Sequence, residues 1–343
     1  MKYLLIGGCG FIGCNFAKHL IENNSDVIIG DNLARKGTHL NLKYLLETHR
    51  GELQFHHLDI RSDFDKLSNL VEQVDVVFHL AAQVAVTTSI VAPREDFEVN
   101  AFGTFNILEA IRKSSSKPLL IYASTNKVYG GMENVQIGNS ESRYFYKTKE
   151  AGISEETQLD FHSPYGCSKG AGDQYVRDYS RIYGLRTVVF RQSCIYGPHQ
   201  YGVEDQGWIA WFTIAALLGK TITIYGDGRQ VRDVLHVKDL FNLWKLAVDN
   251  IDVVSGKVFN VGGGNANTLS LMELLKMLET RMNISIKTNH SGWRSGDQLV
   301  YVSDIKRVSD VLKWKPTIGI EQGLDSLVRW VEENKKEIGE FLS

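Results

Sequence analysis

Residues 3–13 read YLLIGGCGFIG, a short apolar run that leads directly into a cluster of glycines. The run YLLI predicts a buried strand, and residues 11–23, FIGCNFAKHLIEN, carry apolar residues at the spacing of an amphipathic helix. A strand that ends in a tight glycine turn and continues as a helix is the first unit of a doubly wound sheet. The stretch therefore predicts an α/β protein built on a parallel sheet.

The rest of the chain repeats this alternation of strand and helix. Further strands are predicted at residues 26–30, 53–58, 74–80, 118–123, 186–191 and 257–263, and helices at 97–114 and 163–184. After Arg191 the alternation gives way to longer segments rich in Gly and Trp. We therefore expect a Rossmann sheet domain of residues 1–191 and 236–266. A second, smaller α/β domain of residues 192–235 and 267–343 is expected over its carboxyl edge.

Composition excludes several classes of partner. The chain has 343 residues, 43% of them hydrophobic, and a formal net charge of −2, which gives no electrostatic reason to bind nucleic acid or an anionic membrane. The four cysteines form no C-x-x-C pair, so we expect a reducing, cytoplasmic location. The first apolar run is too short for a signal peptide, and no apolar run approaches a transmembrane helix. We expect no metal site, because the adjacent His56 and His57 point to opposite faces of a strand.

The glycine turn has the features of a dinucleotide site. Glycine lets the backbone approach a pyrophosphate without a Cβ in the way, and the helix N-terminus offers free N–H groups. Glycines alone are weak evidence, because tight turns also use glycine for steric reasons. The second strand, however, ends in Asp31 about 20 residues further on, as a dinucleotide motif requires. The residues predicted to hold the pyrophosphate are Gly7, Gly10, Phe11, Ile12 and Gly13.

The end of the second strand favours NAD over NADP as the cofactor. The carboxylate of Asp31, followed by Asn32, can accept hydrogen bonds from the adenosine ribose and would repel a 2′-phosphate. Arg35 and Lys36 are close enough in sequence to weaken this preference, although a solvated basic turn explains them equally simply.

Three later elements complete the expected cofactor side. Asp59 and Ile60 follow the third strand and could flank the adenine, and the small residues after the fourth strand let the backbone pass close to a ribose. Asn100, inside the helix at 97–114, either binds the backbone of a neighbouring strand or makes an ordinary structural contact. The small-residue segment is Leu80, Ala81 and Ala82. The next residue, Gln83, is a candidate to bind the substrate.

A tyrosine and a lysine form the expected reactive group. Tyr165 and Lys169 lie four residues apart in SPYGCSKG, on one face of a predicted helix. A free tyrosine has a pKa of about 10 and is a poor base near neutrality, but a nearby cation stabilises the phenolate and a bound nicotinamide adds positive charge, so we expect the pKa to fall toward the working range. Thr125, at the end of the strand PLLIYAST, would bind the same substrate oxygen. Together these residues could deprotonate an alcohol while its carbon transfers hydride to a nicotinamide.

These motifs resemble those of the extended short-chain dehydrogenases/reductases that act on nucleotide sugars. In that family the matching residues are Thr125 as the hydroxyl, Tyr165 as the base and Lys169 as the group that binds ribose and lowers the pKa of the tyrosine. The resemblance implies NAD-dependent inversion at C2 of a CDP-linked deoxysugar of the lipopolysaccharide O-antigen type, without net oxidation. It also implies a homodimer or homotetramer built on helices 97–114 and 165–182. The segments that carry it are DFHSPYGCSKGAGDQYVRDYSRIYGL, STNKVYG, AAQVAVTTSI, DQGWIAWF and RQVRDVLH.

The residues after Thr125 argue against an elimination reaction. Related 4,6-dehydratases carry an Asp-Glu pair there, because loss of water needs an acid and a base. This chain has Asn126 and Lys127 instead. Asn126 is a candidate to bind a sugar hydroxyl, whereas Lys127 either faces the site or points away along the strand.

Several residues are candidates to bind the substrate itself. Guanidinium groups fork onto phosphate oxygens, so Arg232 and Arg294 are expected at the diphosphate, and Arg229 is more simply a surface residue. The full set of substrate candidates is Gln83, Thr87, Thr125, Asn126, Gln206, Trp208, Arg232 and Arg294.

Two alternatives stay open. A UDP-sugar 4-epimerase of the same fold would use the same three catalytic residues, and segments 130–152 and 199–206 match the family pattern poorly where the sugar and base are expected. A non-catalytic NAD-sensing regulator could dispense with Tyr165 or Lys169, whereas this chain keeps both.

Overall fold

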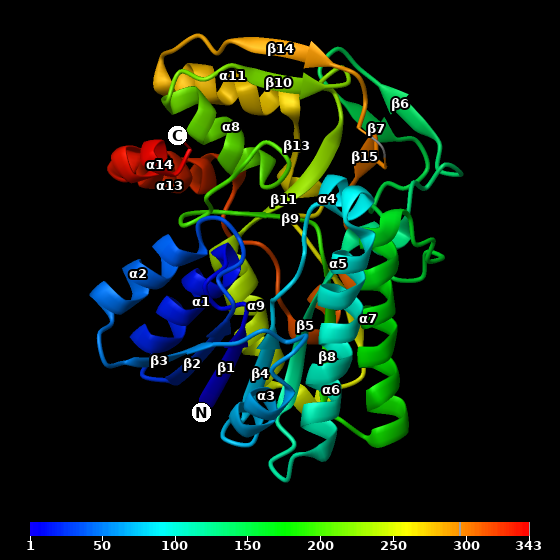
Figure 1. Cartoon of the computed structure of the whole chain (residues 1–343). Coiled ribbons are helices and arrows are strands. Elements are labelled where there is room, and N and C mark those ends of the chain that lie inside the picture. Colours follow the sequence, from blue (N-terminus) through cyan, green and yellow to red (C-terminus); the bar gives the residue numbers. More distant parts are fainter. Residues whose placement is uncertain (295, 343) are drawn as a thin grey trace.

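Seven parallel strands form the central sheet of the computed structural model, which describes residues 1–294 and 296–342. The strand order is β12-β8-β5-β4-β1-β2-β3, so the direction in which successive strands are added to the sheet reverses between β1 and β4 (Figure 1). Every predicted strand is present within a few residues of its expected bounds, and the predicted doubly wound α/β fold is confirmed. The strands are β1 (Lys2–Ile6), β2 (Asp26–Asp31), β3 (Leu53–His57), β4 (Val76–His79), β5 (Leu119–Thr125), β8 (Thr187–Gln192) and β12 (Val258–Val261).

Helices bury an apolar cluster on each face of this sheet. Successive strand residues point to opposite faces, so Leu5 of β1 joins one cluster while Leu4 and Ile6 join the other. The first cluster is covered by α1 (Phe11–Glu22), α2 (Thr38–Thr48), α9 (Val237–Asp249) and α12 (Lys306–Leu312). The second is covered by α3 (Phe64–Val71), α6 (Gly103–Lys113) and α7 (Ser163–Tyr183). Apolar residues on both faces explain why the strands read as continuous hydrophobic runs.

The helix expected at residues 97–114 is interrupted. Helix α5 (Pro93–Phe97) continues as a π-helical turn, η1 (Glu98–Phe102), and then as α6. Such π turns insert one extra residue and commonly occur at functional sites. Here the turn contains Asn100, whose side chain is one of the predicted cofactor-side groups.

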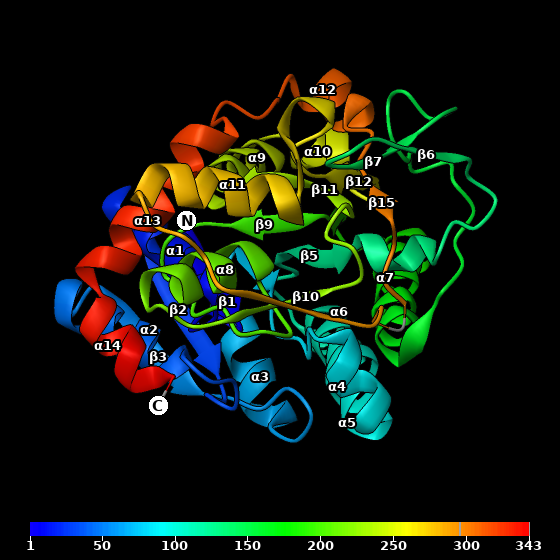
Figure 2. The same ribbon diagram turned by 90° about the horizontal axis from the view of Figure 1, so that it is seen from above.

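A second group of elements lies above the carboxyl ends of the sheet (Figures 1 and 2). It has a separate apolar cluster that includes Ile214, Leu274 and Leu327. Val308 and Trp314 instead join the first sheet cluster, although the expected boundary puts them in the second domain. The two-domain division therefore stays a prediction. The elements are β9 (Cys194–Tyr196), α8 (Trp208–Leu217), β10 (Ile222–Tyr225), β11 (Val231–His236), β13 (Thr268–Ser270), α11 (Leu271–Met282), β14 (Thr288–Ser291), β15 (Val300–Tyr301), α13 (Ile320–Glu333) and α14 (Lys335–Phe341).

Short elements complete the chain. Helix α4 (Val86–Val91) precedes α5, and the 3₁₀ turn η2 (Asn126–Tyr129) follows β5 directly. Strands β6 (Ile137–Asn139) and β7 (Tyr144–Tyr146) pair as an antiparallel hairpin. Helix α10 (Ile251–Val254) follows α9, and the 3₁₀ turn η3 (Asn265–Asn267) precedes β13. In residues 1–294 and 296–342, no helix has both the length and the apolar character needed to cross a membrane.

Candidate active site

The glycine turn leaves open space at the N-terminus of α1. Gly7 has φ +84°, and a Cβ there would lie 2.4 Å from the backbone nitrogen of Ala81. A Cβ on Gly13 would lie 2.6 Å from the carbonyl oxygen of Gly7, so both glycines are required by backbone packing. A Cβ on Gly10, by contrast, would meet just the Gly7 carbonyl oxygen, at 3.3 Å. The turn thus fits a dinucleotide, since Gly10 lets a pyrophosphate reach the N–H groups at the start of α1, which begins with Phe11 and Ile12.

Asp31 ties the end of β2 to this turn. Its carboxylate accepts hydrogen bonds from the backbone N–H of Cys9 (3.0 Å) and of Leu33 (2.8 Å). Burial raises the pKa of Asp31, and these two donors oppose the rise. The neighbouring Asn32 donates to Asp59 over 3.1 Å, so the predicted residues at the ends of β2 and β3 meet in the structure.

Asn100 holds the segment that follows β4. Its side chain accepts from the backbone N–H of Gln83 (3.0 Å) and donates to the Gln83 carbonyl oxygen (2.9 Å), which realises the predicted backbone contact. The amide of Gln83 is itself engaged, because it donates to Asp96 over 2.8 Å. Leu80 and Ala81 each donate a backbone hydrogen bond of 2.8 Å to the carbonyl oxygen of Ile6, which fixes the small-residue segment, with Ala82 next in line, beside the glycine turn. Ile60, after β3, is buried in the second sheet cluster.

Tyr165 and Thr125 meet where β5 ends. Tyr165, in the first turn of α7, is buried and hydrogen-bonded to the Thr125 side chain. The Thr125 hydroxyl oxygen also accepts the backbone N–H of Lys127 over 3.2 Å, which begins the turn η2. Lys169, one helical turn further along α7, is buried and donates from Nζ to the carbonyl oxygen of Ala123 over 2.6 Å. All three predicted catalytic residues therefore gather at the carboxyl edge of the sheet.

The expected low pKa of Tyr165 is not found in the protein itself. Burial raises the pKa of Tyr165 to about 12, and the hydrogen bond from Thr125 and the charge of Arg35 lower it by less. Burial also lowers the pKa of Lys169 to about 7, against the opposing charges of Asp173 and Asp96. Desolvation therefore dominates for the protein alone. The expected fall in the pKa of Tyr165 also depends on the positive charge of a bound nicotinamide, so it stays a prediction.

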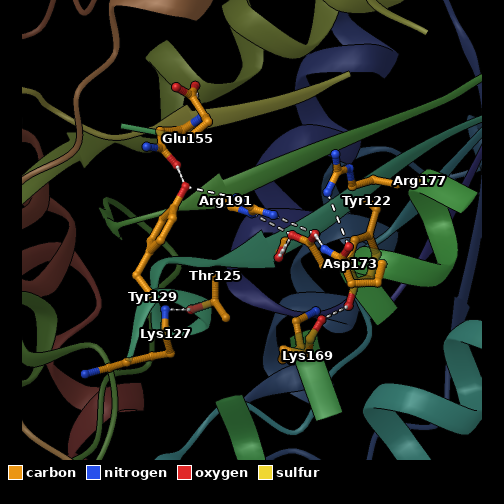
Figure 3. A network of polar contacts seen from close by, with 12 residues as sticks. Tyr122, Thr125, Lys127, Tyr129, Glu155, Lys169, Asp173, Arg177 and Arg191 are labelled. Atoms are coloured by element: carbon orange, nitrogen blue, oxygen red, sulfur yellow. Dashed lines mark hydrogen bonds and ion pairs between the residues drawn. The ribbon is translucent and has the colours of Figure 1, made fainter. Parts of the chain in front are cut away.

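A buried ion pair supports this end of β5 (Figure 3). Asp173, one turn beyond Lys169, accepts two hydrogen bonds from Arg191 of β8, at 2.8 and 2.9 Å, and a third from Ser124 at 2.8 Å. Arg191 also donates to the Tyr129 hydroxyl over 3.1 Å. The pair fixes β5, β8 and α7 relative to one another directly behind Thr125.

A cavity of about 340 Å³ opens between the sheet edge and the second group of elements. Its walls include most of the predicted substrate residues together with Tyr165. Gln83 and Lys169 are not among the lining residues. Lys127 is among them, so of the two orientations left open by the sequence, this residue faces the site. The predicted residues that line the cavity are Thr87, Thr125, Asn126, Tyr165, Gln206, Trp208, Arg232 and Arg294.

Both candidate phosphate-binding arginines have carboxylate partners. Arg232 forms an ion pair of 2.6 Å with Asp297, and Arg294 forms one of 3.0 Å with Asp205. Arg229 pairs with Asp227 outside the cavity lining, in agreement with a surface role.

The structure adds two glutamines that were not predicted. Gln200 and Gln230 line the cavity. Their side-chain oxygens are buried and lack a hydrogen-bond partner among the described residues, as does the hydroxyl of Thr87. Buried polar atoms without partners are costly, so they suit a polar ligand such as a sugar or base. Gln230 stands two residues before Arg232 in the motif RQVRD, so in an extended chain it lies on the same side as Arg232 and could have been predicted from the sequence. Gln200 lies in the segment that matched the family pattern poorly.

Known proteins with this architecture act on nucleotide sugars. The CDP-paratose 2-epimerase of Salmonella typhi is 46% identical over 336 residues, which cover 96% of this chain and 99% of that protein. A dTDP-glucose 4,6-dehydratase double mutant from Streptomyces venezuelae, solved with NAD bound, has a TM-score of 0.85 and 28% identity, with 99% of this chain and 100% of that one covered. The UDP-glucuronic acid 4-epimerase from Bacillus cereus, solved with UDP-glucuronic acid and NAD, has a TM-score of 0.82 and 27% identity, with 97% and 99% covered.

The family model described as GDP-mannose 4,6 dehydratase matches residues 4–327, nearly the whole chain. Its span includes the glycine turn, Thr125, Tyr165, Lys169 and the cavity. The chain therefore belongs to this family, within the extended short-chain dehydrogenases/reductases that modify nucleotide sugars.

Proposed function

We propose that this protein is an NAD-dependent epimerase that inverts C2 of a CDP-linked deoxyhexose, as in the conversion of CDP-paratose to CDP-tyvelose. The observation that carries the proposal is the composition of the reactive end of the cavity. Four residues line this end: Thr125, Asn126, Lys127 and Tyr165. They provide a hydroxyl, an amide, an amine and a phenol, and none of the four is a carboxylate. The 46% identity with a CDP-paratose 2-epimerase supports the same substrate class.

The carboxylates elsewhere in the cavity wall are engaged. Asp297 and Asp205 pair with arginines, and Glu204 accepts a hydrogen bond from the Tyr225 hydroxyl over 2.9 Å. A 4,6-elimination needs an acid and a base at the carbons that react. Asn126 and Lys127, which follow Thr125, provide no carboxylate for either role. An oxidation followed by reduction at one carbon has no such requirement.

Each of the three catalytic residues has its own role in the proposed epimerisation. Thr125 and Tyr165 bind the reacting hydroxyl, and Tyr165 takes its proton as the carbon is oxidised and returns it after the ketone has presented its other face. Lys169 stabilises the phenolate. Bound NAD supplies a hydride acceptor that gives the hydride back, together with positive charge that favours the phenolate. The residues proposed to hold it are those of the glycine turn, with Asp31 at the adenosine ribose.

The cellular setting and assembly follow from the same proposal. We expect a cytoplasmic enzyme of O-antigen sugar synthesis, and four free thiols suit a reducing compartment. We also expect a homodimer or homotetramer. Helices α6 and α7 lie side by side (Figure 1). Exposed apolar side chains lie on these two helices and on η1, and an exposed apolar surface favours association. These side chains are Phe102, Phe105, Tyr175 and Ile182.

A panel of CDP-, UDP-, GDP- and dTDP-hexoses tests the substrate and the inverted carbon by NMR of the product. We expect inversion at C2 of a CDP-deoxyhexose, with no deuterium incorporated at C2 in D2O, because the same hydride returns. Inversion at C4 of a UDP-sugar would favour the alternative epimerase. A 4-keto-6-deoxy product detected by mass spectrometry would contradict the argument from the missing carboxylates.

A further inference from the structure

Lys127 contributes a cation to the cavity that Thr125 and Tyr165 also line. Its backbone N–H binds the Thr125 side chain over 3.2 Å, and its own side chain lines the same cavity as Tyr165 and Arg232. The side chain extends away from the buried network around Asp173 (Figure 3). Only Asn126 stands between Thr125 and Lys127 in the chain, and both residues line the cavity.

This ammonium has no carboxylate partner among the residues that the structure describes. Its Nζ donates to the carbonyl oxygen of Gly296 and to Oε1 of Gln298, both at a long 3.4 Å. Lys127 forms no ion pair in residues 1–294 and 296–342, in contrast to Arg232 and Arg294 in the same cavity. Two long contacts to neutral oxygens leave an ammonium with three donors only partly satisfied.

Lys127 lies near both a second cation, Arg232, and the carboxylate of Asp297. Burial, and then the charge of Arg232, lower the pKa of Lys127 to about 8, while Asp297 acts in the opposite direction. Two cations thus share one carboxylate at this end of the cavity. An anionic group bound between them would relieve their repulsion and favour the charged form of Lys127.

The chemistry of a nucleotide sugar shows which anion can reach this point. The phosphate is attached through oxygen to C1 of the sugar, and C2 is bonded directly to C1, whereas C4 lies across the ring. When C2 is held at Thr125 and Tyr165, the phosphate next to the sugar comes close to them. When C4 is held there, that phosphate lies on the far side of the ring.

We propose that Lys127 binds the sugar-proximal phosphate of the substrate and thereby selects C2, rather than C4, as the carbon presented to Thr125 and Tyr165. The inference rests on the proposed function and deepens it. It makes Lys127 a specificity-determining residue.

Binding of CDP and of CMP tests the phosphate contact directly. CDP has the sugar-proximal phosphate and CMP lacks it, so we expect Lys127→Met to weaken CDP binding by about 10- to 100-fold, as for a lost charged hydrogen bond. CMP binding and NAD content should stay unchanged. Calorimetry on the purified holoenzyme gives the binding constants, and Lys127→Gln is a second variant should the methionine protein fail to fold. Lys149→Met, at an exposed lysine outside the cavity lining, is the matched control and should behave as wild type.

The outcomes separate this inference from the proposed function. Unchanged CDP binding in both Lys127 variants would overturn the inference, as would a loss seen equally with CMP. If the Lys127 variants bind a CDP-hexose more weakly but bind CDP with unchanged affinity, Lys127 contacts the sugar. That result would also overturn the inference. Failure of the wild-type protein to epimerise any sugar of the panel would contradict the proposed function, yet the CDP and CMP comparison would still report on the phosphate contact.

Discussion

Arg191 and Asp173 form a bidentate ion pair that is almost completely buried, with side chains 2% and 0% exposed. The guanidinium comes from β8 and the carboxylate from α7, so the pair joins the sheet to the helix that presents Tyr165 and Lys169. Ser124, the residue before Thr125, donates to the same carboxylate. The position of the catalytic hydroxyl therefore depends on a contact between residues far apart in the sequence.

Loss of the guanidinium should destabilise the protein strongly. Arg191→Met leaves the Asp173 carboxylate buried without its partner, which should cost about 3–5 kcal/mol of unfolding free energy. Urea denaturation measures the loss. Arg94→Met, at an exposed arginine paired with Glu98, is the control and should cost less than about 1 kcal/mol. Equal losses in the two variants would show that the buried pair has no special structural role.

Removal of one hydroxyl group should stop turnover. Tyr165→Phe keeps the ring in place but removes the proposed base, so turnover should fall at least ~100-fold while NAD is retained. Steady-state assay and the nucleotide content after denaturation measure the two quantities. Tyr183→Phe, at an exposed tyrosine on the same helix, should leave turnover unchanged. Full activity in Tyr165→Phe would refute the assignment.

Two glycines of the turn should respond differently to alanine. At Gly10 the added Cβ enters space where we expect the pyrophosphate, so Gly10→Ala should fold normally and bind NAD more weakly. At Gly13 the Cβ would meet backbone at 2.6 Å, so Gly13→Ala should lower thermal stability. Thermal denaturation and NAD titration distinguish the two effects. A Gly10→Ala protein with wild-type NAD affinity would show that the pyrophosphate does not bind at this turn.

The nucleotide released on denaturation tests the role of Asp31. We expect the wild-type protein to release NAD, and release of NADP instead would contradict this role.

Stability should decrease in mild acid because of a buried histidine. Burial lowers the pKa of His236 to about 4, and its Nδ1 accepts the backbone N–H of Lys238 at the start of α9. The unfolded chain binds this proton near pH 6.5, so the contribution is complete above that pH and is lost as the pH falls toward 4. The loss is on the order of 3 kcal/mol from linkage. His236→Asn keeps an acceptor at the helix start, so its unfolding free energy should vary less between pH 7.5 and 5 when measured in urea. An identical pH dependence in the two proteins would exclude His236 as the cause.

The local pattern of the sequence determined the sheet and the cofactor turn. Short apolar runs, the glycine turn and an acidic strand end are short-range features, so the residues from Gly7 to Asp31 could be interpreted without knowing what packs on them. The spacing of Tyr165 and Lys169 likewise followed from the geometry of one helix.

The tertiary structure decided what surrounds those residues. Desolvation depends on every neighbour in space, so the pKa of Tyr165 could not be inferred from its spacing to Lys169. The unpartnered oxygens of Gln200 and Gln230, the π turn at Asn100 and the direction of the Lys127 side chain likewise depend on distant segments meeting at one cavity. A sequence pattern records the order of residues along one element, whereas charge balance and burial at a site are sums over many elements.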